Sequence, residues 1–337
     1  MKKLFCIFLS LMLVFTLMTA SVSAQALNVP SNVLVLGDSI ATGYGLEGYE
    51  FGRENTDNYA NQIARHYELT DSLSNLALDG QTSNELLDKI KDGRYDAKFE
   101  TADLIIISIG GNDLLHYVLG VICNALDISD ISQIETVDYT DPTVLLSVLT
   151  ALSDNTFTEK IEAIVTGFEA AFIEIYQLVK EKAPDANVIF QTIYDPFDQN
   201  ELFTMIDTVA KSVLDNFNRV IRNNATDAEG NEVYKVCDVA LLFEGRGSDL
   251  TNIESYDIHP NGDGHDEIFK ALCPLIEDFE YKIDSISADM QNLRRKAAFV
   301  CVALVVFMVA IIVIYIVRKT DMFSPKVKVD FSKIDKN

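Results

Sequence analysis

The chain has 337 residues, of which 51 are acidic and 27 are basic, and its formal net charge is −24. Residues 1–24 contribute +2 and residues 294–337 contribute +6, so residues 25–293 carry −32. A body this acidic excludes binding to nucleic acid or to an anionic bilayer through its electrostatic field, and it is long enough to bury a core of its own.

The first 24 residues have the pattern of a secretory signal peptide. Lys2 and Lys3 precede an apolar run over residues 4–18, and Val22-Ser23-Ala24 supplies the small residues that a signal peptidase accepts. We predict cleavage after Ala24 and export of the body. An uncleaved anchor is the alternative, although the apolar run is short for a membrane span.

Residues 25–282 have the pattern of alternating strands and helices. The predicted strands cover residues 33–36, 73–78, 104–109, 187–193 and 233–242. The predicted helices cover residues 59–67, 83–91, 202–221 and 263–279, with a further long helix opened by a capping box at Thr156 and Glu159. Strands joined by helical crossovers form a parallel sheet that is covered on both faces. We therefore predict an α/β fold with five parallel strands in the order 2-1-3-4-5.

A second long apolar segment lies near the end of the chain. Residues 297–317 contain no charged side chain, and 21 helical residues span the hydrocarbon core of a bilayer, about 30 Å. We predict a transmembrane helix there, preceded by a juxtamembrane linker over residues 283–296. The tail, residues 318–337, carries six basic and three acidic residues, the bias expected of a cytoplasmic segment. The predicted location is the cell membrane, with the body extracellular.

Three of the predicted strands end in loops that contain glycine. The first is followed by Gly37-Asp38-Ser39, the second by Asp79-Gly80 and the third by Gly110-Gly111-Asn112-Asp113. In the predicted sheet, the strand order reverses between strands one and three. Ligands bind at such a point, beyond the carboxyl ends of the strands. The last loop brings Asp257-Ile258-His259-Pro260 to the same edge. Alone, the first loop is more typical of a plain strand-to-helix turn, and the other loops favour a site.

These blocks resemble the SGNH or GDSL hydrolases, which are serine esterases and lipases on a flavodoxin-like three-layer αβα fold. The matching residues are Gly37-Asp38-Ser39 with Gly43-Tyr44-Gly45, then Gly80, then Gly110-Gly111-Asn112-Asp113, then His259-Pro260-Asn261 with Gly264-His265. They occur in the family's order between residues 32 and 275, which is most of the predicted domain, residues 25–282. One such block is weak evidence, whereas four in order are specific.

The resemblance implies a division of roles among six residues. Ser39 is the expected nucleophile and His259 the expected general base. The oxyanion hole is expected to use the backbone N–H groups of Ser39 and Gly80 and the side-chain amide of Asn112. Without the other blocks, Asn112 would be more typical of a helix cap. Asp38 and Asp113 are expected to make supporting hydrogen bonds, and no chemistry is assigned to either. Neither a cofactor nor a metal is implied.

The acidic residue expected beside the histidine departs from the family's pattern. The family usually places an acid three residues before the histidine, but here that position is Tyr256 and the acid, Asp257, lies two before His259. We expect Asp257 to orient His259, with Glu254 or a backbone carbonyl as the alternative. The favoured function is a membrane-anchored extracellular esterase acting on an acylated sugar or a lipid. A surface binding module that has lost the chemistry is the alternative class.

Residues 114–155 form a longer segment than a crossover needs, and they are strongly apolar. They are predicted to form either a lid or acyl-binding wall over the site, or extra helical packing on the sheet. Cys123, Cys237 and Cys273 allow one disulfide or none, and a buried free thiol is the simpler interpretation for each. The glycine pattern over residues 43–48 matches a dinucleotide fingerprint only by chance, because it begins well after the strand ends.

Overall fold

The computed structural model describes residues 29–50, 57–129, 133, 136–138, 141–199 and 204–281, together with residues 296, 306 and 310. The predicted signal peptide lies outside these residues, and so does almost all of the predicted transmembrane segment, residues 297–317. Among the residues that are described, no helix is both long and apolar enough to cross a membrane. The chain divides into two compact units, Met1–Lys282 and Ile283–Asn337, and the sheet lies in the first.

The sheet has five parallel strands in the order β2-β1-β3-β4-β5, which confirms the predicted topology. The strands are β1 (Val33–Gly37), β2 (Leu73–Asn75), β3 (Leu104–Ser108), β4 (Asn187–Gln191) and β5 (Lys235–Cys237). Every residue of β1 and β3 is buried, as the uninterrupted apolar runs predict for strands that are covered on both faces.

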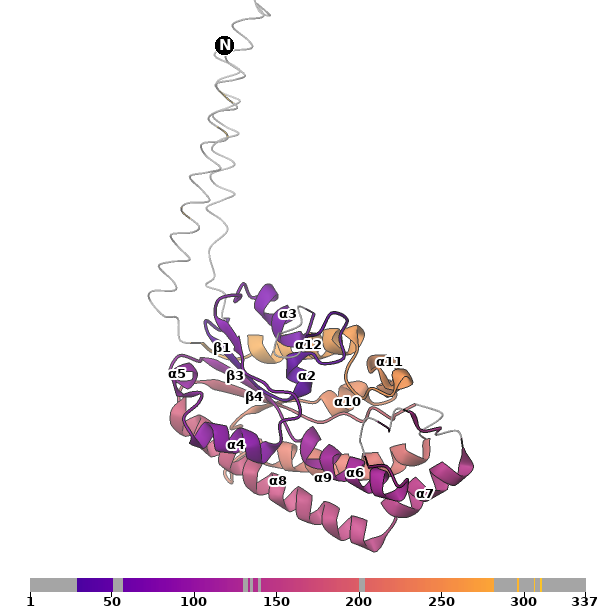
Figure 1. Ribbon diagram of the computed structural model, residues 1–337. Coiled ribbons are helices and arrows are strands. Elements are labelled where there is room, and N and C mark those ends of the chain that lie inside the picture. The colour runs from indigo at the N-terminus through magenta and orange to yellow at the C-terminus, as the bar shows by residue number, and fades with distance from the viewer. Residues whose placement is uncertain are drawn as a thin grey trace, which may run out of the picture. The chain divides into compact units, whose positions relative to one another are not determined.

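Helices cover both faces of the sheet (Figure 1). They are α2 (Ser39–Thr42), α3 (Tyr59–His66), α4 (Ser83–Lys91), α5 (Asp96–Phe99), α6 (Gly111–Ala125), α7 (Pro142–Leu152), α8 (Asn155–Lys182), α9 (Thr204–Asn223), α10 (Val239–Phe243), α11 (Gly247–Leu250) and α12 (Gly262–Glu277). Alternate residues of each strand face opposite layers. Val33 and Val35 pack in the cluster with α3 and α12, whereas Leu34 and Leu36 pack in the cluster with α4, α8 and α9.

Three predicted elements differ in the structure. The second strand, predicted over residues 73–78, is only Leu73–Asn75. The fifth strand is only three residues long, and the rest of the predicted strand, to residue 242, is helix α10. The helix forms because Asp238 caps it, accepting a hydrogen bond from the Leu241 N–H at 3.3 Å. The predicted capping box at Thr156 and Glu159 is wrong. Asp154 caps α8 instead, with its carboxylate 2.6 Å from the Thr156 nitrogen.

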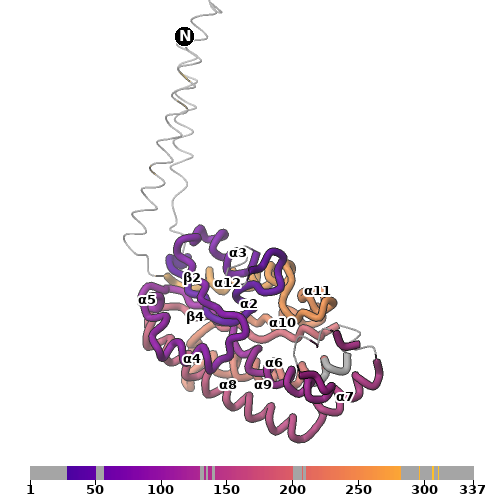
Figure 2. Tube along the Cα trace, in the orientation of Figure 1, coloured from indigo at the N-terminus to yellow at the C-terminus, as the bar shows by residue number. Residues whose placement is uncertain are grey.

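The carboxyl ends of β1 and β3 meet at one edge of the sheet. Gly37 pairs with Ser108, and a Cβ on Gly37 would lie 2.2 Å from the Ser108 carbonyl oxygen, so only glycine fits. The segment that follows β3 does not return directly to the sheet. It forms α6 and α7, which lie beside each other near α8 and α9 (Figure 2). The loop after β1 and the start of α6 therefore share one side of the molecule with this helical layer.

Candidate active site

Ser39 is the first residue of the short helix α2, directly after β1. Asp38 caps the helix, and its carboxylate accepts a hydrogen bond from the Ile40 N–H at 3.1 Å. Gly43 closes the helix in the left-handed conformation, with φ of 84°. The turn leaves Ser39 only 7% exposed, facing the cavity described below.

His259 contacts Ser39 although 220 positions separate them in the chain. The imidazole Nε2 lies 2.8 Å from the Ser39 Oγ, and the Nδ1 lies 2.5 Å from the Asp257 Oδ1. An ionised carboxylate can only accept a hydrogen bond, so the Nδ1 must carry the proton. In the neutral imidazole the Nε2 is then an acceptor for the Ser39 hydroxyl. The structure thus brings the predicted hydroxyl, imidazole and carboxylate into one chain of contacts.

Asp257 reaches His259 because it lies only two residues before it. The same carboxylate oxygen accepts hydrogen bonds from the His259 backbone N–H at 3.0 Å and from the ring Nδ1. Burial alone would raise the pKa of Asp257, but the hydrogen bonds and charge of His259, with a hydrogen bond from Asn252, hold its pKa below the ordinary value. The unusual spacing, which motivated the binding-module alternative, therefore leaves an ionised acid on the imidazole.

Three hydrogen-bond donors belong to the loops around Ser39. The backbone N–H groups of Ser39 and Gly80 donate to no other residue in the described part of the chain. The amide nitrogen of Asn112 donates one hydrogen to the Gln81 carbonyl at 3.2 Å, which leaves its second hydrogen available. The cap of α6 is Gly110, so Asn112 does not have the capping role. Its side chain is 6% exposed and lines the same cavity as Ser39.

Asp38 and Asp113 lie behind these groups. Asp113 accepts hydrogen bonds from the backbone and hydroxyl of Ser83, which fixes the start of α4 to the start of α6. Burial raises the pKa of Asp113. Burial also raises the pKa of Asp38 to about 7, against partial opposition from the hydrogen bond of the Ile40 N–H and the charge of His259.

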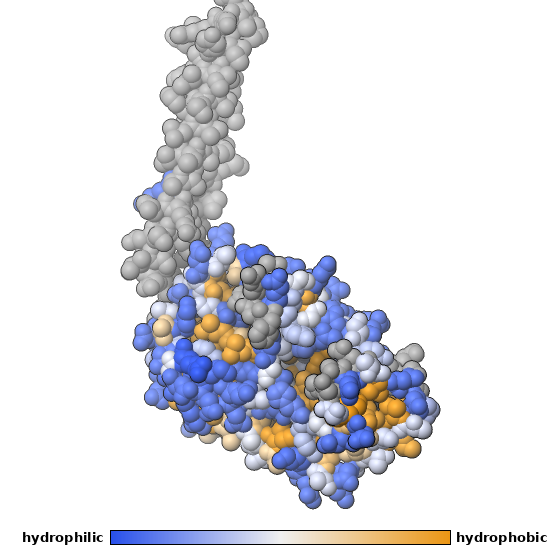
Figure 3. All heavy atoms as spheres, viewed as in Figure 1, coloured by the Kyte–Doolittle hydropathy of each residue, from blue (hydrophilic) through white to orange (hydrophobic). Residues whose placement is uncertain are grey.

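A cavity of about 220 Å³ opens beside Ser39. Its polar residues include Ser39 at the start of α2, Asn112 at the start of α6 and His259 in the loop before α12. Its walls are apolar and come mainly from α6 and α9, with Leu115, Val118, Ile122, Val213 and Leu214 among the lining residues. Described residues of the segment 114–155 line the cavity and also pack on the core. The predicted extra helical packing is therefore present, and the role as a lid or acyl-binding wall stays a prediction. Hydrophobic residues gather at the surface near α7 in Figure 3.

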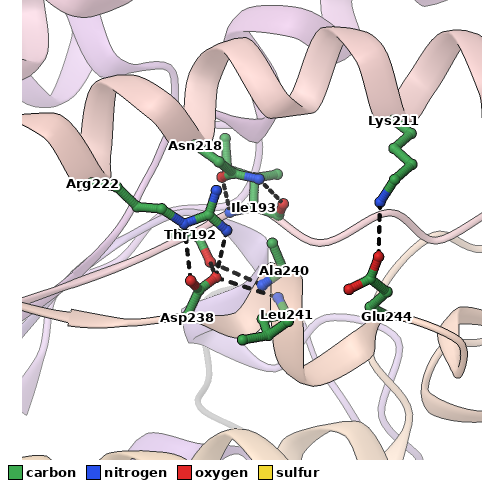
Figure 4. Close-up of polar contacts among 9 residues, drawn as sticks. All are labelled: Thr192, Ile193, Lys211, Asn218, Arg222, Asp238, Ala240, Leu241 and Glu244. Atoms are coloured by element: carbon green, nitrogen blue, oxygen red, sulfur yellow. Dashed lines mark hydrogen bonds and ion pairs between the residues drawn. The ribbon is translucent and has the colours of Figure 1, made fainter.

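A polar network fixes one wall of this cavity (Figure 4). Asn218 on α9 bonds both backbone groups of Ile193, a lining residue, at 2.7 and 2.8 Å. Arg222, one turn further on, makes two hydrogen bonds to Asp238 at 2.7 and 2.9 Å. Asp238 also accepts a hydrogen bond from Thr192 at 2.9 Å. The second half of α9 is thereby fixed to the segments that follow β4 and β5.

Sequence reasoning missed some residues at the site. Tyr44 packs on the imidazole of His259, with ring centroids 4.5 Å apart. Gln81 supplies the carbonyl that orients Asn112. Tyr44 lies inside a glycine block and Gln81 directly follows Gly80, but nothing in the sequence there indicates their contacts. Asn252 also bonds to the loop that carries Asp257 and His259, and no local sequence pattern indicates this contact.

The remaining candidates lie elsewhere. His265 is fully buried against Tyr59, and burial lowers its pKa to about 3. The three cysteines of the body are free thiols, of which only Cys237 is fully buried. Within the described ranges, no group of three or more His, Cys, Asp or Glu side chains is placed to hold a metal ion.

The chain belongs to the GDSL-like lipase/acylhydrolase family, whose model matches residues 35–267. This confirms the resemblance found in the sequence. A curated relative, the uncharacterized protein YpmR of Bacillus subtilis (strain 168), is 24% identical over 250 residues, which cover 73% of this chain and 81% of that protein.

Among solved structures, the chain is similar to phospholipase A1 from Streptomyces albidoflavus NA297. The TM-score is 0.52 and the identity 19%, over 73% of this chain and 99% of that one. It is also similar to the lipase Lip_vut3 from a goat rumen metagenome, with a TM-score of 0.48 and 20% identity, over 72% of this chain and 96% of that one. At 19% identity the likeness to the phospholipase shows the fold alone.

Proposed function

We propose that this chain is a serine esterase that hydrolyses carboxylic esters through an acyl-enzyme on Ser39. The observation that carries the proposal is the continuous contact from the Ser39 Oγ through His259 to Asp257, beside an apolar cavity. Family membership supports the acylhydrolase class, and the geometry supports the assignment of individual roles.

The first half-reaction would form the acyl-enzyme. The Ser39 Oγ attacks the ester carbonyl while the His259 Nε2 takes the hydroxyl proton. Asp257 stabilises the resulting imidazolium and keeps its ring in place through the Nδ1. The carbonyl oxygen becomes an oxyanion, which would receive hydrogen bonds from the N–H groups of Ser39 and Gly80 and from the Asn112 amide. The imidazolium then gives its proton to the departing alcohol.

The second half-reaction would release the acid. A water molecule attacks the acyl carbonyl, and the His259 Nε2 now takes the proton of the water. The collapse of the second tetrahedral intermediate breaks the bond to the Ser39 Oγ, which recovers its proton from the imidazolium. Asn112 suits both steps because its amide donates without titrating.

The cavity favours an ester with an extended acyl chain. Most of its lining residues are apolar, and the walls from α6 and α9 present side chains such as Val118 and Leu214. Each methylene buried there would contribute about 0.8 kcal/mol. A lipid acyl ester is therefore the proposed substrate class, in preference to an acetylated sugar.

We further propose that the enzyme is anchored at the cell membrane with its catalytic domain extracellular. The support is the apolar run over residues 4–18 and the uncharged run over residues 297–317. Protease treatment of intact cells tests this proposal, because it should digest the body and spare the tail. Digestion of the tail with protection of the body would reverse the orientation.

Labelling with a fluorophosphonate probe tests the chemistry directly. The wild-type protein should be labelled and should hydrolyse p-nitrophenyl esters, whereas Ser39→Ala should do neither. The matched control is Ser147→Ala, which removes a hydroxyl on exposed α7 and should leave labelling intact. Wild-type protein that is folded but neither labelled nor hydrolytic would leave only the binding-module alternative.

A further inference from the structure

The turn that carries Asp257 and His259 lies directly on the backbone of Gly45. Gly45 has a φ of +87°, and a Cβ at this position would lie 2.7 Å from the Asp257 Oδ2. The same Cβ would lie 3.0 Å from the Asn252 Nδ2 and 3.1 Å from the His259 Cβ. Three side chains therefore meet over one glycine, in a space that any larger residue would fill.

Asn252 is bonded to each of the residues at this junction. Its side-chain Nδ2 donates to the Gly45 carbonyl at 3.0 Å. Its backbone N–H donates to the His259 carbonyl at 3.0 Å, and its own carbonyl accepts from the Asp257 N–H at 3.3 Å. Its Nδ2 also lies beside the Asp257 carboxylate, because both would lie within 3.0 Å of the same Cβ position on Gly45, and Asn252 contributes to the low pKa of that carboxylate. One amide hydrogen of Asn252 is bonded to the Gly45 carbonyl, and the second is available to the neighbouring carboxylate.

We propose that Asn252 is a positioning residue that holds the Asp257 carboxylate so that its Oδ1 faces the His259 Nδ1. This inference rests on the proposed esterase function. The side chain of Asp257 is 27% exposed. One oxygen of its carboxylate is bonded to His259, and the other is free to turn toward water unless a second donor fixes it. Asn252 is such a donor. Because it is neutral, it does not compete with the imidazolium for the carboxylate, as a lysine would.

A double-mutant cycle tests whether Asn252 acts through Asp257. Asn252→Ala alone should lower kcat for ester hydrolysis about tenfold, the effect of one hydrogen bond to a charged group, with KM unchanged. In the Asp257→Ala background, the same substitution should lower kcat by less than about twofold. Losses that multiply independently in the double variant would overturn the proposal.

Asn261→Ala is the matched control. Its amide also bonds backbone groups of the same loop, the carbonyls of Asp249 at 2.8 Å and Thr251 at 3.1 Å, and its side chain caps α12. This variant should lower the melting temperature while kcat, measured below that temperature, stays near the wild-type value. Equal losses of kcat in Asn252→Ala and Asn261→Ala would mean that Asn252 only stabilises the loop.

A readout that needs no catalysis separates this proposal from the proposed function. The His259 Nδ1 proton, bonded to a carboxylate, should give a downfield proton resonance that Asn252→Ala moves or abolishes and Asn261→Ala leaves in place. An unchanged resonance in Asn252→Ala would refute the positioning role. Absence of fluorophosphonate labelling in the wild type would instead refute the esterase, whatever the resonance shows.

Discussion

Val118→Phe should shorten the acyl chain that the enzyme prefers. Val118 lines the cavity from α6 and is half-buried. Phenylalanine is larger than valine by the volume of about two methylenes, which it would take from the cavity. Because each buried methylene contributes about 0.8 kcal/mol, kcat/KM of the wild type should rise about fourfold per carbon until the cavity is full. The variant should lose about 1.6 kcal/mol of that gain, or roughly 15-fold in kcat/KM, on a decanoyl ester.

The assay is hydrolysis of p-nitrophenyl esters from acetyl to dodecanoyl, with kcat/KM measured at each length. On the acetyl ester Val118→Phe should stay within about twofold of the wild type, because a two-carbon chain does not reach α6 beyond the first turn. His116→Phe is the control, since it places a phenyl ring at an exposed position of the same helix. Equal losses on acetyl and decanoyl esters would show that α6 contributes packing and not acyl recognition.

Three further predictions concern the polar residues of the site. His259→Ala should lower kcat about 10³- to 10⁴-fold, but Asp257→Ala only about 10- to 100-fold, because water can reach its partly exposed position; equal losses would indicate a strictly acid-dependent triad. Asn112→Ala should lower kcat about 10²-fold or more with little change in KM, and a change confined to KM would remove it from the oxyanion hole. Asp38→Asn should stabilise the fold at pH 8. The folded pKa of Asp38, about 7, exceeds its ordinary value of 3.8, so stability is lost as pH rises between these values, by up to about 4 kcal/mol. Urea unfolding at pH 4 and pH 8 should show the gain only at pH 8, and an equal gain at both would contradict this origin.

The sheet could be predicted from the sequence because its signals are local. The apolar runs of β1 and β3 are continuous and end in glycine, and all residues of both strands are buried. The helix that replaces the end of the predicted fifth strand could not be predicted in this way. It depends on Asp238, whose carboxylate is held by Arg222 from another element and caps α10 at the same time. Residues 239–242 are apolar enough for a strand, and only this tertiary contact decides otherwise.

The candidate site was predictable to the extent that its residues lie in short blocks. Ser39, Gly80, Asn112 and His259 each belong to such a block, so the order of the strands was enough to bring them to one edge. Asn252 belongs to none, because its contacts depend on how the loop folds back over Gly45. The part of the cavity wall that α6 supplies falls in the segment 114–155, for which a wall was one of the two predictions. The part that α9 supplies was not predicted, since helical periodicity does not say which elements a helix will face.

Two carboxyl groups lie near the imidazole of His259, and their surroundings keep them in different charge states. Asp257 receives hydrogen bonds from the His259 backbone, the ring and Asn252, which outweigh its burial and keep it ionised. Asp38 is almost completely buried, which raises its pKa. The hydrogen bond from the Ile40 N–H and the charge of His259 lower this pKa only in part, so below pH 7 the carboxyl group is mostly neutral. The difference suits the proposed chemistry. A charge at Asp257 stabilises the imidazolium that forms when Ser39 attacks, whereas a full charge at Asp38, next to Ser39 in the chain, would oppose the developing oxyanion.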